Sequence, residues 1–205
     1  VSLCLPKLVS FRTELVPSLL KSQFGKLLSE VSFERKIGPG YGVAAIVKGG
    51  GLKVLTNQHI LEQVQQVIQN KKAQDWEKEG ILVLVEGLGK VLGSSVEPYL
   101  QELLPFVIDS LSSKTLQSQA SRVIKALIPK LSVQGMKVLL QVVADESEGW
   151  KRRIGGIEAL GKLGYCRGRQ LSLCLPQALP HLMRAFGDTN VQVKEAATKA
   201  FKDIA

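Results

Sequence analysis

Apolar residues near the end of the chain recur at helical spacing. After the polar turn Asp188-Thr189-Asn190, one side of a 3.6-residue wheel carries Val191, Val193, Ala196, Ala197, Ala200, Phe201 and Ile204. Lysines and other polar residues occupy the opposite side, so the segment predicts an amphipathic helix whose apolar stripe needs a neighbour. The preceding segment, from about 169 to 186, is also leucine-rich at helical spacing, and Gly187 can end it as a helix. The two segments predict a helical hairpin.

Similar hairpins recur earlier in the chain. Glu86-Gly87-Leu88-Gly89 returns as Glu158-Ala159-Leu160-Gly161, and Leu104-Pro105 returns as Leu179-Pro180. Each offset equals two units of about 36–38 residues, a length typical of HEAT repeats. A single hairpin cannot bury its own apolar face, so repeats of this kind stack on one another. We therefore predict an all-α HEAT-repeat solenoid of stacked antiparallel helix pairs. Because the chain begins with Val and stops within a helical pattern, we expect it to be a fragment of a longer array.

The hairpins predict a division of the chain into repeats. The predicted segments are 1–55, which holds irregular or incomplete N-terminal repeats, and then 56–96, 97–133, 134–168 and 169–205. Within 33–55 we expect a second helix with small residues that pack closely on a neighbour, ended by Gly49-Gly50-Gly51, with Pro39 disturbing its start. One amphipathic helix is expected from Thr56 to Ala73, and another from Asp75 to about Leu92.

The sequence offers little for catalysis or for a bound cofactor. The glycines near Lys48 lack the GxxxxGK and GxGxxG spacings of phosphate and dinucleotide loops. With two histidines and three cysteines but no CxxC pair, neither a metal site nor a histidine-based catalytic centre is expected. Asp145 and Glu146 are typical of turn and cap positions. No apolar run approaches the roughly 18 residues that span a membrane. We expect a cytoplasmic protein that is not an enzyme, with no cofactor and no metal.

The charge is strongly basic and unevenly spread. The net charge is +9, and between Trp150 and Arg184 seven basic residues stand against the single acidic residue Glu158. Such a concentration favours a polyanionic partner, either RNA or an acidic protein. The candidate contact residues are Lys151, Arg152, Arg153, Lys162, Arg167, Arg169, Arg35, Lys36, Lys71 and Lys72.

The stretch Trp150-Lys151-Arg152-Arg153 is the most distinctive of these. A helical wheel places Trp150 on the apolar side, which predicts a ring buried between repeats, whereas Lys151 and Lys162 point outward. Arg153 maps close to the apolar stripe, so it must either emerge from the first turn or find an acidic partner. The stretch is interpreted either as a ridge that contacts phosphates or acidic groups, or as an ordinary solvated face.

With the hairpins placed, the chain resembles one family over roughly residues 34–205. Five blocks in register carry the resemblance: Glu34-Arg35-Lys36, Glu97-Pro98-Tyr99, Lys130-Leu131-Ser132, Trp150-Lys151-Arg152 with Cys174-Leu175-Pro176, and Val193 with Glu195-Ala196. The family is that of the very large HEAT-repeat translational activators of general amino-acid control, whose central region is similar to the HEAT domain of elongation factor three.

The resemblance implies a non-enzymatic scaffold that associates with ribosomes and helps to activate the kinase of initiation factor two alpha when ribosomes stall or amino acids are scarce. It also implies partners: the ribosome, through rRNA and ribosomal proteins, and, for a full-length protein, an ABC-type ATPase and the stress kinase. One alternative is a generic HEAT adaptor, such as a nuclear-transport receptor or a phosphatase scaffold. Another is an elongation-factor-three ATPase, which would carry GxxxxGK[ST] beyond Ala205.

Overall fold

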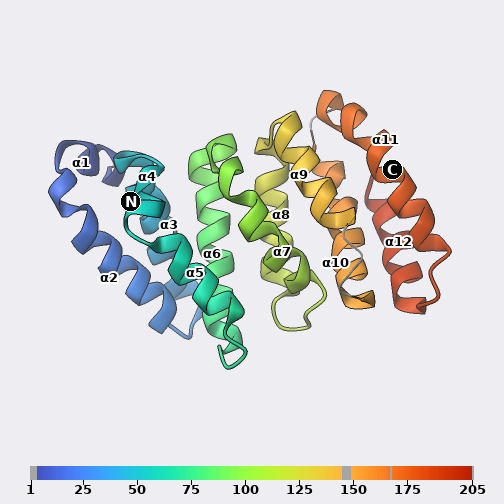
Figure 1. The fold of residues 1–205 in the computed structure, drawn as a ribbon, viewed down its shortest axis with the longest axis horizontal. Coiled ribbons are helices and arrows are strands. Elements are labelled where there is room, and N and C mark those ends of the chain that lie inside the picture. Colours follow the sequence, from blue (N-terminus) through green and yellow to red (C-terminus); the bar gives the residue numbers. More distant parts are fainter. Residues whose placement is uncertain (1–3, 145–148, 167, 205) are drawn as a thin grey trace. The chain divides into compact units, whose positions relative to one another are not determined.

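A computed structural model describes residues 4–144, 149–166 and 168–204. These residues form helices joined by turns, and none of them lies in a strand, as predicted for an all-α protein. By contact, the chain separates into two compact units, Val1–Ser95 and Val96–Ala205 (Figure 1). The finer division into five repeats stays a prediction.

Helix α3 lies at the centre of the first unit. The helices of this unit are α1 (Leu5–Phe11), the short 3-10 helix η1 (Thr13–Leu15), α2 (Val16–Ser29), α3 (Phe33–Gly50), α4 (Lys53–Asn57), α5 (Ile60–Gln69) and α6 (Asp75–Leu92). Helix α3 packs against α1, α2 and α6. Its side chains Val43, Ile46 and Val47 are fully buried, and with Leu82 and Leu84 of α6 they form the core of this unit.

Small residues bring α3 and α6 close together. A Cβ atom added at Gly40 would lie 2.7 Å from Cγ1 of Val83, and one added at Gly87 would lie 3.2 Å from the carbonyl oxygen of Gly40. This confirms the expected close packing of the glycine-rich segment. The helix passes through Pro39 without a break and ends at Gly51, whose φ of 86° favours glycine.

The prediction of a single helix from Thr56 to Ala73 is wrong. The chain instead forms α4 and α5, because His59 adopts a left-handed conformation with φ 54° between them. The next helix, α6, has the predicted bounds. A capping box at Gln74 and Glu77 starts it, and Gly93, with φ 62°, ends it.

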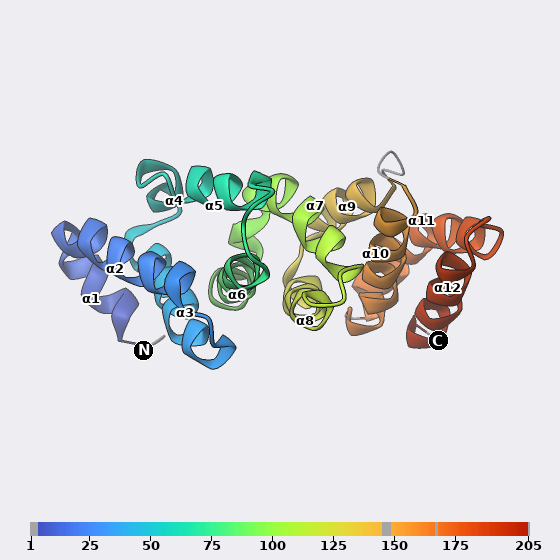
Figure 2. The same ribbon diagram turned by 90° about the horizontal axis from the view of Figure 1, so that it is seen from below.

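The second unit is built from three consecutive helix pairs. A 3-10 segment, η2 (Gly93–Tyr99), leads into α7 (Leu100–Leu111), α8 (Gln117–Leu127), η3 (Ile128–Lys130), α9 (Val133–Ala144), α10 (Trp150–Gly161), η4 (Lys162–Tyr165), α11 (Gly168–Phe186) and α12 (Val191–Ile204). Figure 2 shows α9 and α11 in one layer of this unit, with α10 and α12 in the other. Helix α10 packs against α7, α9, α11 and α12, so it is the central helix of the unit.

Candidate functional site: the basic stretch at the start of α10

Two glycines allow α10 to lie very close to its neighbours. A Cβ atom added at Gly155 would overlap the carbonyl oxygen of Ile108 in α7, and one added at Gly161 would lie 2.9 Å from Cα of Ala200 in α12. The helix begins after Gly149, which has φ 86°. The basic stretch therefore starts a helix that is fixed on both sides. The predicted turn residues Asp145 and Glu146 lie outside the described residues.

Trp150 is exposed, contrary to the expectation that it is buried between repeats. Its relative exposure is 39%, and Lys151, also exposed, places its ammonium 5.7 Å from the centroid of the indole ring. The helical wheel put Trp150 on the apolar side, but the packed side of the first turn of α10 carries Arg152, which is 6% exposed. An exposed indole beside a lysine is available to a ligand.

Arg152 is buried, and this corrects its assignment as a surface contact. Its guanidinium forms an ion pair with Asp109 of α7 and donates a hydrogen bond of 2.7 Å to the carbonyl oxygen of Pro105. Only 6% of Arg152 is exposed. Its charge therefore ties α10 to α7.

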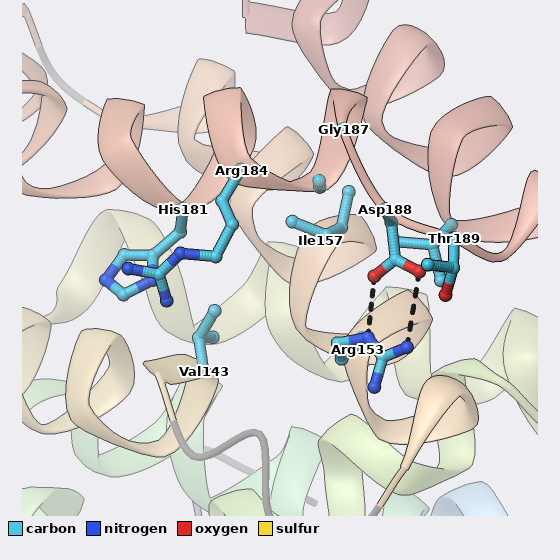
Figure 3. A pocket seen from close by; sticks show the side chains of 10 residues that line it. Val143, Arg153, Ile157, His181, Arg184, Gly187, Asp188 and Thr189 are labelled. Carbon is cyan, nitrogen blue, oxygen red and sulfur yellow. Dashed lines mark hydrogen bonds and ion pairs between the residues drawn. The ribbon is translucent and has the colours of Figure 1, made fainter.

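Arg153 finds the acidic partner that its position on the wheel required. Its Nε donates to Oδ2 of Asp188 at 2.7 Å, and its Nη2 donates to Oδ1 at 3.2 Å (Figure 3). These hydrogen bonds, together with one from the backbone of Asn190, hold the pKa of Asp188 below its ordinary value. The pair connects α10 to the turn before α12.

Two further candidates are also engaged inside the protein. The ammonium of Lys162 lies 2.8 Å from Oδ2 of Asp203, and it is the main reason that the pKa of Asp203 is lowered. Lys36 is completely buried and pairs with Glu79 at 2.5 Å. Like Arg152, Lys36 is therefore not a surface contact, because a binding partner cannot reach its buried charge.

The remaining candidates lie on the surface. Lys151, Arg169, Arg35, Lys71 and Lys72 are exposed, and none forms an ion pair with another described residue. Arg167 lies outside the described residues. The structure therefore divides the predicted set into cations that hold helices together and cations that face solvent. It does not gather all of them into one site.

Two pockets flank the start of α10. The first, of about 260 Å³, lies between α10 and α11; Arg153 and Asp188 form one side, and His181 and Arg184 lie across it (Figure 3). It is smaller than the roughly 300 Å³ at which ligand sites usually begin. The second is wider, about 860 Å³, and we call it the Trp150 hollow; Asp109, Lys114, Trp150, Lys151, Arg152 and Gln192 are among the residues that line it.

Sequence reasoning missed Lys114, which lies in the turn between α7 and α8 and is exposed. A signal for it exists, because Lys114 precedes Lys151 by about one repeat. Equivalent positions of stacked repeats lie side by side, so lysines one repeat apart are expected to meet on one edge.

The described residues contain no helix that is long and apolar enough to cross a membrane. They also contain no group of three or more His, Cys, Asp or Glu side chains arranged to hold a metal ion.

Comparison with known proteins identifies the family. The family model for the EF3 N-terminal HEAT repeat matches residues 38–201. The chain is 32% identical over 208 residues to the stalled ribosome sensor GCN1 of Mus musculus. It is also 32% identical over 214 residues to the eIF-2-alpha kinase activator GCN1 of Dictyostelium discoideum. Both alignments cover the whole chain but only 8% of the relative.

Elongation factor 3 of Gonapodya prolifera is 26% identical over 168 residues, which cover 79% of this chain and 15% of that protein. The chain thus spans a small part of each of these relatives. The resemblance seen in the five sequence blocks is confirmed, and the chain belongs to the family of the EF3 N-terminal HEAT repeat.

Proposed function

We propose that the chain is a non-enzymatic, ribosome-associated scaffold segment that helps to activate the kinase of initiation factor two alpha in the cytoplasm. The observation that carries the proposal is similarity over the whole chain to proteins named as a stalled ribosome sensor and as activators of that kinase. Because the chain spans 8% of those relatives, the proposal concerns one segment of a scaffold. An ABC-type ATPase and the stress kinase would be engaged by the protein as a whole.

The distribution of charge supports contact with the ribosome. Five candidate cations, Lys151, Arg169, Arg35, Lys71 and Lys72, face solvent and have no ion pair with another described residue. Cations of this kind are suited to phosphate groups of rRNA, because no internal acid competes for them. Contacts of this kind supply affinity that depends on salt, and they carry little sequence specificity.

Co-sedimentation with purified ribosomes over a salt series tests the proposal. One variant reverses the five exposed candidates to Glu, and its matched control reverses five other exposed lysines: Lys26, Lys48, Lys53, Lys130 and Lys137. Each set changes three residues of the first unit and two of the second, so the change in net charge is equal. Arg152, Arg153 and Lys36 are left intact, because reversing them would disrupt internal ion pairs.

We expect wild type to pellet with ribosomes and to dissociate as the salt concentration rises. In a plot of log affinity against log salt concentration, each phosphate contact should contribute a slope close to one. The candidate variant should lose binding while the control retains most of it. Equal loss in both variants would mean attraction by net charge without a defined contact surface. A wild-type chain that stays in the supernatant at low salt would contradict ribosome association and favour an adaptor for protein partners.

A further inference from the structure

We propose that the Trp150 hollow binds an unpaired nucleotide of single-stranded RNA, with the base stacked on Trp150 and the neighbouring phosphates held by Lys114 and Lys151. The proposal deepens the proposed function and rests on it for the source of the RNA, the ribosome. It adds a specific site and a partner chemistry, which family membership does not provide.

The hollow is an open depression of about 860 Å³. Such a surface suits a ligand that lies across it better than one that is enclosed. The hollow is lined by the turn after α7, by the first turn of α10 and by Gln192 at the start of α12. Its walls thus come from three successive helix pairs, so the packing of the second unit shapes it.

Trp150 provides the face for stacking. Indole rings are usually largely buried, yet 39% of Trp150 is exposed, and the ring borders the hollow. Lys151 lies over the same ring, 5.7 Å from its centroid. A base stacked there would take the place of the Lys151 ammonium over the ring, and that ammonium would then pair with the phosphate, as in proteins that bind single-stranded nucleic acid.

The charges that line the hollow favour an anion. Lys114 and Lys151 are exposed, and Arg152, which is buried, also lines the hollow. Among the described residues that line the hollow, Asp109 is the single acid, and it already pairs with Arg152. The positive charges of the two lysines are therefore left to an incoming ligand.

A nucleotide fits this combination better than an acidic peptide does. Acidic side chains would satisfy the lysines but would leave the indole face in contact with water. Each nucleotide of a single strand offers one planar base and one phosphate, so it uses both features at once. Paired bases are not available for stacking on a side chain, so the strand must be unpaired at this point.

Tryptophan fluorescence and RNA anisotropy test the proposal directly. The chain contains two tryptophans, so Trp76→Phe leaves Trp150 as the single fluorophore. We expect oligouridylate to quench Trp150, and an RNA duplex of equal length to leave its emission nearly unchanged. With a labelled oligouridylate, Trp150→Ala should weaken binding about tenfold. Lys114→Glu should make the plot of log affinity against log salt concentration less steep by about 0.7, because one phosphate contact is lost.

The control uses a second exposed aromatic that has a lysine over its ring but does not line the hollow. Tyr165 is 51% exposed, and Lys125 lies 5.1 Å from its ring centroid. The variant Tyr165→Ala/Lys125→Glu should bind RNA much as wild type does. The inference is overturned if this control loses as much affinity as Trp150→Ala/Lys114→Glu. It is also overturned if duplex RNA or polyglutamate binds with the same dependence on Trp150.

Failure of this inference can be separated from failure of the proposed function. If the chain pellets with ribosomes but Trp150→Ala/Lys114→Glu binds both ribosomes and oligouridylate normally, the nucleotide site is wrong and ribosome association stands. Because Lys114 is exposed in a turn, Lys114→Glu alone still tests the hollow if Trp150→Ala proves less stable.

Discussion

Arg152 of α10 and Asp109 of α7 form an ion pair in which the cation is buried and the acid is half exposed. The side-chain exposures are 6% for Arg152 and 46% for Asp109. The two partners therefore differ in what their removal leaves behind. Without Asp109 a buried charge remains, whereas without Arg152 a carboxylate remains that water can reach.

This asymmetry predicts different costs for the two substitutions. Asp109→Asn should destabilise the second unit by about 2–3 kcal/mol, because the guanidinium loses its counter-charge in a buried position. Arg152→Met should cost about 1 kcal/mol, because a long apolar side chain retains much of the packing. Urea denaturation followed by circular dichroism measures both variants. Equal costs would show that the pair contributes through contact alone.

Asp188 predicts a dependence of stability on pH. Its pKa is lowered in the folded state, first by hydrogen bonds from Arg153 and next by the backbone N–H of Asn190. A carboxyl with a lowered folded pKa stabilises the protein above its unfolded pKa, about 3.9 for aspartate, and this contribution is lost as pH falls through the folded pKa. Asp188→Asn should therefore be less stable than wild type at pH 7.

The difference between Asp188→Asn and wild type should shrink at pH values below about 4, because the protonated acid then resembles the amide. Thermal denaturation at pH 7 and at pH 3 measures this difference. A gap that stays constant between these two pH values would mean that the charge of Asp188 does not contribute.

Gly155 and Gly25 predict opposite effects of the same substitution. Gly155→Ala would place a methyl group on the carbonyl oxygen of Ile108, and we expect a loss of about 2–3 kcal/mol as α10 is pushed from α7. Gly25, in α2, has no atom within 4 Å of an added Cβ. Gly25→Ala should therefore stabilise its helix by about 0.5–1 kcal/mol, because alanine favours helix formation. Denaturation midpoints that move in the same direction would contradict this difference.

The helix ends could be predicted because they depend on local chemistry. Gly93 ends α6 and Gly51 ends α3, each with a positive φ that glycine adopts without strain. The break at His59 could not be predicted in this way, because the apolar spacing continues across it and a non-glycine residue takes the left-handed conformation. Periodicity indicates that a segment is helical, and an interruption by one residue leaves little trace in it.

The apolar stripe predicted for α12 is wider than the part of the helix that its neighbours bury. Val193, Ala196, Ala197 and Ala200 are buried, as the wheel suggested, but Val191 is 65% exposed and Phe201 is 47% exposed. Helices α10 and α11 cover the middle of the stripe. At its edge Phe201 meets Phe186 of α11 edge-on, with the ring centroids 6.2 Å apart. A wheel shows one helix, whereas burial depends on the width of its neighbours.

The sequence also could not show which candidate cations pair inside the protein and which face solvent. Arg152 pairs with an acid 43 residues away, Lys162 with one 41 residues away, and Lys36 with one 43 residues away. These separations are close to one repeat, so the pairs link neighbouring hairpins. Spacing alone would not have separated these cations from Lys151, because Asp109 and Asp188 lie 42 and 37 residues from Lys151 as well. The wheel of a single helix does not show such pairs either.

The cysteines should react with thiol reagents at very different rates. Cys4 is exposed, whereas Cys174 is buried, and burial, with a smaller effect from Cys174, raises the pKa of Cys166 to about 11. At pH 8 about one Cys166 in a thousand is then the reactive thiolate. Iodoacetamide followed by mass spectrometry should find Cys4 modified first, and all three cysteines modified quickly in urea. If Cys166 reacts as fast as Cys4 in the folded chain, then η4 does not stay packed against α8 and α12, and the contacts that hold Tyr165 and Lys125 together are not stable.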